Sequence, residues 1–410
     1  MTLQETMNDM GRAARAATAA LRKASAKQRS DAIRAMAHHL RARAGEVIEA
    51  NRADVAEARG MIDRLRLDEA RVEAIAAALE EVAELPDPVG AEMARWQRPN
   101  GLDIARVRTP IGVIGMIYES RPNVTADAAA ICIRSGNAII LRSGSDALRS
   151  AMAIHRALAD GLSEAGLPQA AVQIVPVADR AAVGMMLEGL DGSVDLIIPR
   201  GGKALVERVQ KEARVATLGH LEGICHTYVH ASADPAMAAA VVANAKMRRV
   251  SVCGATETLL IDRARAATLL PIIAEALGDC ELRGDESARA ILPMKAAAEA
   301  DWSTEYLEPI LSVRVVDDVA DAVDHIARYG TGHTEAIIAE DEGAAALFLD
   351  EVDSAIVAWN ASTQFADGGE FGFGAEIGIA TGKLHARGPV GPEQLTSFKY
   401  VVRGRGHVRP

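Results

Sequence analysis

Short, mostly apolar segments alternate with helical patterns through the middle of the chain, and this alternation limits the possible folds more than any other sequence feature. The apolar segments are VIGMIY (113–118), AIIL (138–141), VQIVPV (172–177) and VDLIIP (194–199). Helical patterns follow Pro122, begin at an expected N-cap near Ser145 and Asp146, and start again at Gly202. A strand without a polar face must be covered on both sides, so the pattern predicts a parallel, doubly wound sheet between helices.

A second α/β pattern occupies the C-terminal half. Its apolar segments are ETLLID (257–262), ILSVRVV (310–316), AIIA (336–339) and AIVAWN (355–360), again separated by helical patterns. Because 410 residues are too many for one ordinary core, we expect two α/β domains. Residues 4 to 93 are rich in Ala, Arg and Glu. They are predicted to form helices that cover a sheet and that end at Pro86 and Pro88.

Residues 95–109 hold two short alternating runs on either side of Asn100-Gly101, a pair typical of a β-hairpin turn. A hairpin that interrupts a domain often reaches to another subunit, so we expect a homo-oligomer. The final stretch, TSFKYVVRGRGHVRP, has the pattern of a strand with a basic tail and is predicted to pair with this hairpin.

Charge and cysteine usage exclude several classes of function. The net charge is −11 and no basic tract offsets it, which disfavours nucleic acid as a partner. The four cysteines are scattered without a C-x-x-C pair, so we expect no disulfide framework, no zinc or other metal site, and a reducing, cytoplasmic location. The chain has no run of about 18 apolar residues, so no membrane span is expected. The first residues lack the apolar core of a signal peptide.

Polar and small residues follow directly after the predicted strands of the first α/β pattern. These strand ends read ESR (119–121), RSGS (142–145) and RGGK (200–203). Parallel sheets bind ligands at the carboxyl ends of their strands, and helix N-termini beside a guanidinium suit phosphate groups. Two such turns favour a nucleotide over ordinary turn chemistry. The fingerprint G-x-G-x-x-G is absent, and the similar stretches FGFGAEIG and GIATGK have the wrong spacing.

Cys253 lies where a helical pattern from Pro235 to Met247 passes through two arginines into the apolar run at 258–261. A cysteine in such a turn suits a nucleophile, because the thiolate is the reactive form and nearby cations lower its pKa. Gly254 is expected to leave room for a substrate near the backbone. The alternative for Cys253 is a small buried hydrophobic residue, the usual state of a free cysteine and the one expected for Cys132.

Several longer segments carry a resemblance to one known family. They are residues 108–142 (RTPIGVIGMIYESRPNVTADAAAICIRSGNAIILR), IIPRGG (197–202), LEGICHTYV (221–229), NAK (244–246) with Cys253 and ETLL (257–260), STEYLEPILSV (303–313), YGTGHTEAI (329–337), NAST (360–363), FGFGAEIGI (371–379) and HARGPVG (385–391). Across essentially its whole length the chain resembles the aldehyde dehydrogenase superfamily, and within it the family of glutamate-5-semialdehyde dehydrogenases. The stretches SRPNVT, IPRGG and HARGPVG are specific to this branch.

The resemblance implies an aldehyde dehydrogenase-like α/β fold with three parts. These are an NADPH-binding domain (residues 1–94 and 110–230), a catalytic domain (231–390) and a β oligomerisation element (95–109 and 391–410). It also implies a reaction in proline biosynthesis, in which NADPH reduces L-glutamate 5-phosphate to L-glutamate 5-semialdehyde and phosphate is released. A transient contact with glutamate 5-kinase would suit so unstable a substrate.

The same resemblance implies residue roles. Cys253 would attack the acyl carbon and form a thioester, while Asn123 or Ser120 would donate to the developing oxyanion. Arg142 would contact the 2′-phosphate of NADPH, and Glu305 its nicotinamide ribose. Further cofactor contacts are expected from Ser143, Gly201 and Gly202, and contacts with the substrate's phosphate or carboxylate from Arg121, Arg248, Ser362 and Thr363. For Arg248, a charge that stabilises a helix C-terminus is the alternative.

One departure from the superfamily concerns its catalytic base. Hydrolytic members carry a glutamate in an E-L-G-G stretch that activates water, where this chain has His220-Leu221-Glu222-Gly223. An enzyme that exchanges its thioester with phosphate needs no such water. A shifted alignment would put Glu222 at the base position instead of His220. Two other functions stay open: an acylating aldehyde dehydrogenase that uses coenzyme A, and a non-catalytic scaffold of the same fold.

Overall fold

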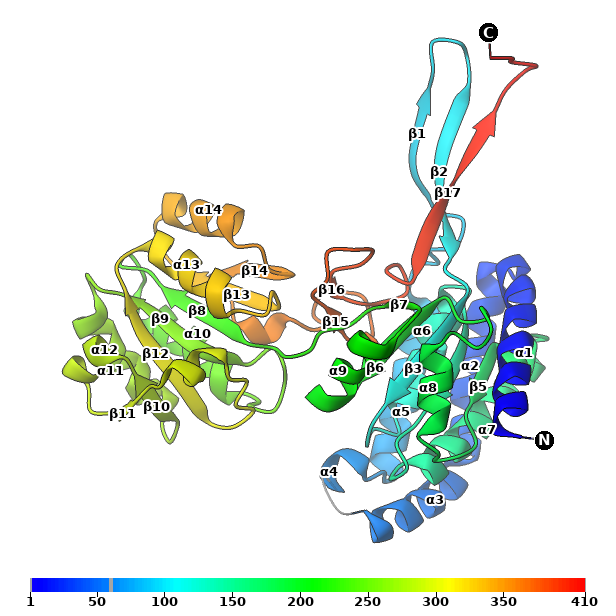
Figure 1. The fold of residues 1–410 in the computed structure, drawn as a ribbon, viewed down its shortest axis with the longest axis horizontal. Helices are drawn as coiled ribbons and strands as arrows, with labels where there is room; N and C mark the ends of the chain where they lie inside the picture. Colours follow the sequence, from blue (N-terminus) through cyan, green and yellow to red (C-terminus); the bar gives the residue numbers. More distant parts are fainter. Residues whose placement is uncertain (1, 59–61, 410) are drawn as a thin grey trace. The chain divides into compact units, whose positions relative to one another are not determined.

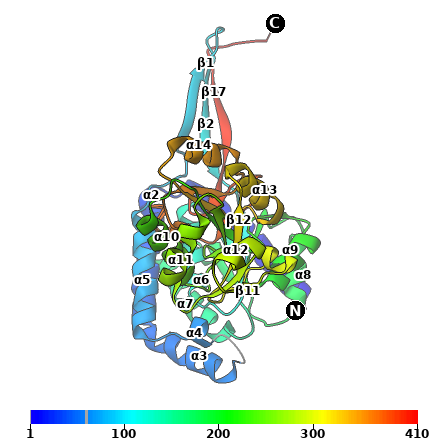
Figure 2. The same cartoon turned by 90° about the vertical axis from the view of Figure 1, so that its left-hand side faces the viewer.

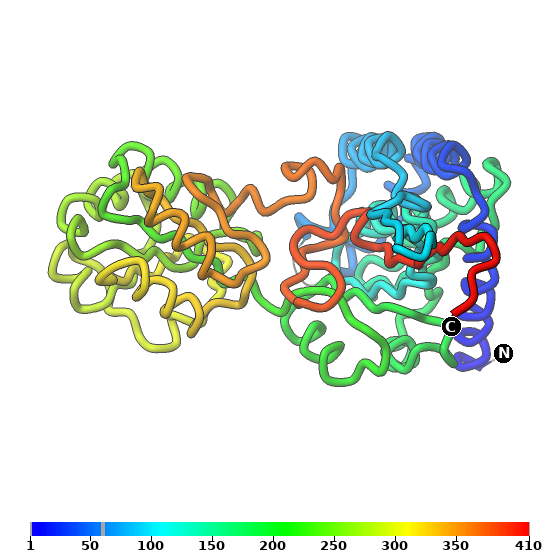
Figure 3. The backbone as a smooth tube through the Cα atoms, turned by 90° about the horizontal axis from the view of Figure 1, so that it is seen from above, coloured from blue at the N-terminus to red at the C-terminus, as the bar shows by residue number. Residues whose placement is uncertain are grey.

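The computed structural model describes residues 2–58 and 62–409, and the chain divides into two compact units (Figure 1). The first unit is the chain up to Gly219, together with Gly372–Gly378 and the residues from Val390 onward. The second unit is His220–Phe371 with Ile379–Pro389. Figure 3 shows the C-terminal segment, in red, returning to the first unit. Among the described residues, every helix is too short or too polar to span a bilayer.

A five-stranded parallel sheet forms the centre of the first unit. Its strands are β3 (Val113–Tyr118), β4 (Ala138–Arg142), β5 (Val172–Ile174), β6 (Leu196–Arg200) and β7 (Ala216–Thr217), in the order β5-β4-β3-β6-β7. The four apolar segments are thus confirmed as strands. β5 is shorter than predicted and ends ahead of Pro176, which has no N–H to donate to a ladder. The strand order reverses next to β3, the position where such sheets bind ligands.

Helices connect these strands as the doubly wound pattern predicts. They are α6 (Val124–Arg134), α7 (Leu148–Glu164), α8 (Ala181–Leu187) and α9 (Lys203–Glu212). The strand order runs one way through α6 and α7 and the other way through α8 and α9, so right-handed crossovers put the two pairs on opposite faces. The cap predicted for α7 at Ser145 and Asp146 is wrong. Its N-cap is Ala147, because the Asp146 carboxylate accepts a hydrogen bond from Ser120 Oγ instead.

In the described part of the chain, five helices precede the first strand: α1 (Leu3–Lys23), α2 (Ala26–Ala42), α3 (Ala44–Glu57), α4 (Ile62–Leu65) and α5 (Glu69–Glu84). The predicted helical region is confirmed, and it ends ahead of Pro86. α1 packs on the sheet, whereas α2 and α5 pack on α6 and α7 as an outer layer (Figure 2). The backbones of α2 and α7 approach closely at Gly161, where a Cβ atom would lie 2.4 Å from the Met36 nitrogen.

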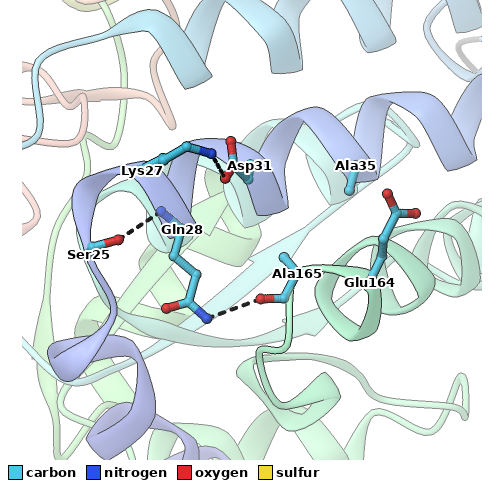
Figure 4. Close-up of a pocket in the computed structure, with 7 residues that line it drawn as sticks. All are labelled: Ser25, Lys27, Gln28, Asp31, Ala35, Glu164 and Ala165. Carbon is cyan, nitrogen blue, oxygen red and sulfur yellow. Dashed lines mark hydrogen bonds and ion pairs between the residues drawn. The ribbon is translucent and has the colours of Figure 1, made fainter.

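Polar contacts join the start of α2 to the end of α7 around a surface pocket (Figure 4). Within α2, Lys27 Nζ lies 2.5 Å from an oxygen of Asp31. Gln28 Nε2 donates to the carbonyl oxygen of Ala165 over 3.0 Å. Exposed contacts of this kind stabilise a fold only slightly. We therefore give the pocket a packing role.

Strands β1 (Glu92–Gln97), β2 (Asp103–Pro110) and β17 (Thr396–Arg403) form a separate antiparallel sheet that extends from the rest of the first unit (Figure 1). β17 pairs with all of β2, which confirms the predicted return of the C-terminal strand to the hairpin. Gly101 has a φ of +88° at the turn, a conformation that glycine adopts without strain. Ala105 is fully buried, but most other strand residues are exposed or half-buried. The sheet therefore has almost no core of its own.

The second unit is built on a seven-stranded parallel sheet. Its strands are β8 (Cys225–Val229), β9 (Thr256–Asp262), β10 (Glu281–Gly284), β11 (Lys295–Ala296), β12 (Ile310–Val316), β13 (Thr334–Ile338) and β14 (Ile356–Trp359), in the order β11-β10-β12-β9-β8-β13-β14. The four predicted segments are confirmed as strands. β8, which precedes the predicted domain boundary at residue 230, belongs to this sheet.

Both faces of the second sheet are covered by helices (Figure 1). α10 (Pro235–Met247), α11 (Ala266–Leu277) and α12 (Glu286–Ile291) enclose one apolar core, which includes Leu259 and Ile261 of β9. α13 (Val319–Tyr329) and α14 (Glu342–Glu351) enclose the other, which includes Leu260. Alternate residues of one strand thus enter opposite cores, as the mostly apolar segments predict. The short pair β15 (Ile379–Ala380) and β16 (Gly388–Pro389) completes the unit.

Candidate active site

Four strands of the second sheet begin side by side, and their amino ends bring together residues that are far apart in the sequence. β9 pairs with both β8 and β12, and β8 pairs with β13. The segments that precede these four strands contain His220, Cys253, Glu305 and His333. The candidate site of this unit therefore lies at the amino ends of the strands, although ligands of parallel sheets usually bind at the carboxyl ends.

Cys253 occupies the turn between α10 and β9, as predicted. It is partly exposed, whereas Cys132, Cys225 and Cys280 are buried. Burial raises the pKa of each of these three thiols above its ordinary value. Cys253 is therefore the thiol that a substrate can reach. Arg248, the C-cap residue of α10, is exposed, and its Nη1 lies 3.4 Å from Gln364 Oε1.

The segment before β8 passes very close to Cys253. A Cβ atom on Gly223 would lie 2.2 Å from the carbonyl oxygen of Cys253 and 2.7 Å from its Cβ, so this position requires glycine. The Gly223 amide donates to Glu305 Oε1 over 3.0 Å. Below the turn, the Cys225 thiol donates to the carbonyl oxygen of Cys253 over 3.1 Å. Glu305 and Cys253 thus contact the same short segment.

Two histidines flank Cys253. His220, Cys253 and His333 each contribute one donor atom to a group in which all three lie within 4.8 Å of one another. His220 Nδ1 lies 2.6 Å from the carbonyl oxygen of Ile379, which can only accept, so the neutral ring carries its lone pair on Nε2. The two imidazoles meet edge to face with centroids 4.8 Å apart. An imidazole that belongs to His220 therefore lies beside the thiol.

His333 is completely buried. Its Nδ1 lies 2.9 Å from Thr334 Oγ1 and 3.5 Å from the sulfur of Cys225. Its Nε2 is also buried and makes no hydrogen bond within the described part of the chain. A buried nitrogen without a partner costs free energy, and a ligand in the site would supply that partner.

A buried ion pair joins the elements on either side of the Cys253 turn. Lys246, in the last turn of α10, and Glu257, in β9, are both completely buried, with Nζ 2.5 Å from Oε2. The other oxygen of Glu257 accepts from the Leu307 amide over 3.4 Å, and Lys246 Nζ lies 5.7 Å from the ring centre of Tyr306. Burial, only partly offset by Lys246, raises the pKa of Glu257 to about 7. The pair therefore ties Cys253 to the loop that carries Glu305.

Ser362 and Thr363, two residues predicted to contact the substrate, use their hydroxyls for hydrogen bonds within the second unit. Ser362 is buried, and its Oγ caps a short helical turn by accepting from the Gln364 amide. Thr363 is completely buried, and its hydroxyl lies 3.0 Å from that of Thr256. The nearest atom to a Cβ added at Gly254 would be the carbonyl oxygen of Thr363, at 3.1 Å, so Gly254 allows close backbone packing. A substrate contact at Ser362 or Thr363 remains a prediction.

In the first unit, the carboxyl ends of β3, β4 and β6 are aligned, with Ile117 opposite Arg142 and Tyr118 opposite Arg200. Arg142 is 8% exposed, and its Nη2 donates to the carbonyl oxygen of Ala178 over 2.9 Å. Its Nε is buried and makes no hydrogen bond to a described residue. Burial, the largest cause, lowers the pKa of Arg142, yet a guanidinium stays charged. A buried cation with an unused N–H at this edge suits an anionic ligand.

A carboxylate occupies the helix N-terminus at which a phosphate is expected. Gly202 is the N-cap of α9, and its amide donates to Glu119 Oε2 over 2.9 Å. A Cβ on Gly201 would lie 2.5 Å from the same oxygen, so Glu119 in this position leaves no room for a side chain there. Ser143 is buried, and its hydroxyl donates to the Gly144 carbonyl over 3.2 Å. The Glu119 carboxylate thus occupies the place at the helix N-terminus where an anionic ligand would bind.

The remaining predicted site residues, Arg121 and Asn123, follow β3 in the first unit and are half-buried. Asn123 Nδ2 donates to Asp127 Oδ2 over 2.9 Å. Ser120, the alternative oxyanion donor, has a φ of +46° and contacts Asp146. Their predicted roles toward the oxyanion and the substrate remain predictions.

Sequence reasoning did not assign roles to His333, Cys225 or the Lys246–Glu257 pair. All four residues lie within quoted family segments, YGTGHTEAI, LEGICHTYV, NAK and ETLL. The available signal was a polar residue that interrupts or immediately precedes an apolar strand. Glu257 and His333 both meet this description, and their burial follows from the sheet.

The chain is similar to known proteins over nearly its whole length. A sequence model of the aldehyde dehydrogenase family matches residues 2–308. A gamma-glutamyl phosphate reductase of Caulobacter vibrioides is 66% identical over 98% of this chain and 100% of its own length. One from Hyphomonas neptunium is 61% identical over 100% of this chain and 97% of its own. The crystal structure of gamma-glutamyl phosphate reductase from Thermotoga maritima superposes with a TM-score of 0.96 at 44% identity and covers 98% of this chain and 100% of that one.

Proposed function

The chain belongs to the aldehyde dehydrogenase family, and within it to the gamma-glutamyl phosphate reductases, and we propose that it uses NADPH to reduce L-glutamate 5-phosphate. The products are L-glutamate 5-semialdehyde, NADP⁺ and phosphate, a step of proline biosynthesis. The observation that carries this proposal is the 66% identity to a reductase of that name over 98% of the chain. Cys253 is partly exposed, whereas the other three cysteines are buried, and this supports Cys253 as the nucleophile.

Covalent catalysis by Cys253 accounts for the exchange of phosphate for hydrogen. The thiolate attacks the acyl carbon, the bond from that carbon to the phosphate oxygen breaks, and phosphate leaves a thioester behind. After reduction, the oxyanion of the thiohemiacetal collapses, the carbon–sulfur bond breaks, and the aldehyde and the thiolate are released. The Cys253 amide is one proposed donor to that oxyanion, with Asn123 as the other.

His220 is the proposed acceptor of the thiol proton. Its Nδ1–H is committed to the Ile379 carbonyl, which leaves Nε2 as the basic nitrogen, and the ring lies in the same cluster as Cys253. An imidazole here is also a competent base for water. A base at His220 in place of a glutamate would therefore not by itself protect the thioester from hydrolysis, and phosphate dependence would come from competition between phosphate and water at the thioester.

The residues of the first unit fit a dinucleotide phosphate. Arg142 offers a buried guanidinium with an unused N–H, and the turn at Gly201 and Gly202 already binds a carboxylate. We propose that Arg142 and Ser143 face the 2′-phosphate side, that the two glycines face the pyrophosphate, and that Glu305 holds the nicotinamide ribose. When bound, NADPH supplies the hydride. Glu119 has to leave the Gly202 amide before a phosphate can take its position.

The deciding assay runs the reaction backward with wild-type protein. NADP⁺ reduction is followed with glutamate 5-semialdehyde alone, with added phosphate, and with added coenzyme A. Phosphate-dependent reduction is the expected result. Activity with coenzyme A in place of phosphate would identify an acylating enzyme of another branch, and activity without either would identify a hydrolytic one. A folded protein that is inactive in all three arms would support the scaffold alternative.

Arg142→Ala is expected to lower kcat/KM for NADPH by about 10- to 100-fold, the effect of losing charge-assisted hydrogen bonds to a phosphate. The value for NADH, which lacks the 2′-phosphate, should change by less than about twofold on the same grounds. The measurement is kcat/KM for both cofactors in each protein, with Arg180→Ala as a control for the loss of a neighbouring exposed charge. An unchanged ratio of the two cofactors in Arg142→Ala would remove the residue from the phosphate site.

We also propose that the antiparallel sheet mediates a homo-oligomer. Residues alternate faces along β17, so Phe398, Tyr400 and Val402 share one face, where they are 44%, 56% and 56% exposed, and Trp96 packs against Tyr400. So many exposed apolar side chains on one face mark an interaction surface. Val402→Lys is expected to lower the mass measured by light scattering. Ser397→Lys, which adds the same charge to the opposite face, should leave the mass unchanged; equal masses for both variants would contradict this role.

Two proposals concern the cellular setting. The four cysteines lack any disulfide, which suits the reducing cytoplasm. An unstable acyl phosphate would benefit from direct transfer from glutamate 5-kinase. Co-sedimentation of the two enzymes tests that contact, and cell fractionation tests the location.

A further inference from the structure

The cluster of His220, Cys253 and His333 has the donor set of a transition-metal site. It offers one thiolate sulfur and two imidazole nitrogens within 4.8 Å of one another, all in the second unit. Sulfur and imidazole nitrogen are the ligands that Zn²⁺ and related borderline ions prefer, whereas Mg²⁺ and Ca²⁺ prefer oxygen. A three-residue set leaves the fourth tetrahedral position to water, as in zinc sites with exchangeable ligands.

Both imidazoles are oriented as metal ligands usually are. A ligating histidine normally engages its second ring nitrogen with a protein oxygen, which fixes the tautomer and the ring orientation. His220 Nδ1 donates to the Ile379 carbonyl, and His333 Nδ1 lies 2.9 Å from the Thr334 hydroxyl. In each ring Nδ1 is thus the nitrogen that this oxygen engages, and Nε2 is the other candidate donor atom. For His333 this nitrogen is completely buried and makes no hydrogen bond to the described residues, so the site already contains an unmet need for a partner.

The distances are compatible with a bound ion after a small closure. Bond lengths of about 2.0 to 2.3 Å to Zn²⁺ separate tetrahedral ligand atoms by roughly 3.3 to 3.8 Å, so the widest pair has to approach by about 1 Å. Rotation of the Cys253 side chain moves the sulfur relative to both imidazoles. His220 lies on an irregular segment ahead of β8 and is half-buried, so it too can adjust, while His333 is fixed by packing.

We propose that this cluster binds one Zn²⁺ ion per chain and that zinc is thereby a reversible inhibitor of the Cys253 thiol. Binding forms a sulfur–zinc bond and displaces the thiol proton to solvent, with no change of oxidation state. The sulfur lone pair that would attack an acyl carbon is then held by the metal. Because the thiol and the imidazoles must give up their protons, affinity rises with pH. A chelator restores the free thiol.

Cobalt provides a direct reading of the site, because Co²⁺ replaces Zn²⁺ in tetrahedral thiolate–imidazole sites and gives a sulfur-to-metal charge-transfer band. Titration of the full chain with Co²⁺ is expected to produce this band with one ion per chain, and added Zn²⁺ should abolish it. Cys253→Ser should lose the band, and His220→Ala should weaken Co²⁺ binding by at least about tenfold. Cys225→Ser, which removes the thiol next to the cluster but outside it, should keep both band and affinity.

The same titration has outcomes that overturn the proposal. These are no charge-transfer band in the wild type, a band that survives in Cys253→Ser, a band lost only in Cys225→Ser, or unchanged affinity in His220→Ala. If a variant does not fold, the wild type still answers, since Zn²⁺ should slow alkylation of Cys253 by iodoacetamide at least about tenfold, and an unaffected rate overturns the idea. The Co²⁺ titration needs no substrate. A protein that binds Co²⁺ but shows no phosphate-dependent NADP⁺ reduction would therefore refute only the proposed reaction.

Discussion

Replacing Cys253 with serine is expected to lower phosphate-dependent NADP⁺ reduction by about 10³- to 10⁶-fold, the range found when a covalent nucleophile is removed from an enzyme. The hydroxyl of serine is smaller than the thiol and is scarcely ionised at neutral pH, so the variant fits the site and loses the reactive anion. Initial rates with glutamate 5-semialdehyde and phosphate measure the effect. Binding of NADP⁺ should change little, since the cofactor does not react with the thiolate.

Cys225→Ser is the matched control for this experiment. Cys225 is buried directly below the turn and donates to the Cys253 carbonyl, a bond that a serine hydroxyl can replace. It should retain activity within about threefold, because hydrogen bonds of this kind contribute about 1 kcal/mol. More than a tenth of wild-type activity in Cys253→Ser would exclude the thioester route. Equal losses in two folded variants would mean that the turn, and not its thiol, is what matters.

The fold was predictable where a strand is mostly apolar. Eight such segments were predicted, and all eight are strands in the two parallel sheets. The strands that sequence reasoning passed over have polar composition. β8 reads CHTYV and β10 reads ELRG. In β8 the polar side chains are satisfied inside the sheet, as where His226 Nδ1 lies 2.9 Å from Glu335 Oε2 with both residues completely buried. Because the two polar partners lie on different strands, the sequence of either strand alone shows no apolar pattern that would predict it.

Cys253 could be predicted from its own local pattern and His220 and Glu305 only from the family resemblance, whereas His333 was not predicted. Cys253 is marked by a local pattern, a helix that ends in arginines before a strand. His333 and His220 reach it only because β8, β9 and β13 are adjacent and in register. The absence of short-range metal-ligand spacing led to the prediction that there is no metal site. That rule detects ligands close in sequence, whereas a parallel sheet assembles ligands from distant loops.

Lys246→Met is expected to destabilise the protein by about 3 to 5 kcal/mol, the usual cost of leaving one partner of a buried ion pair alone. Lys246 and Glu257 are both completely buried and 2.5 Å apart. A Lys246→Met, Glu257→Met double variant should recover most of the loss, because a buried pair is often replaced by apolar residues without penalty. Urea denaturation followed by circular dichroism gives the free energy of unfolding for each protein. A double variant as unstable as the single one would contradict a charge-based explanation.

The pH dependence of unfolding separates this mechanism from simple loss of packing. Burial raises the pKa of Glu257 to about 7, so between pH 4.5 and about 7 the folded chain holds a proton that the unfolded chain has lost. Stability from this group therefore falls as pH rises through that window, by about 1.4 kcal/mol per unit, and levels off above it. Without Lys246, which lowers this pKa, the fall should continue above pH 7. The gap in unfolding free energy between wild type and Lys246→Met should thus widen from pH 7 to 9, whereas a pure packing defect gives a gap that does not vary with pH.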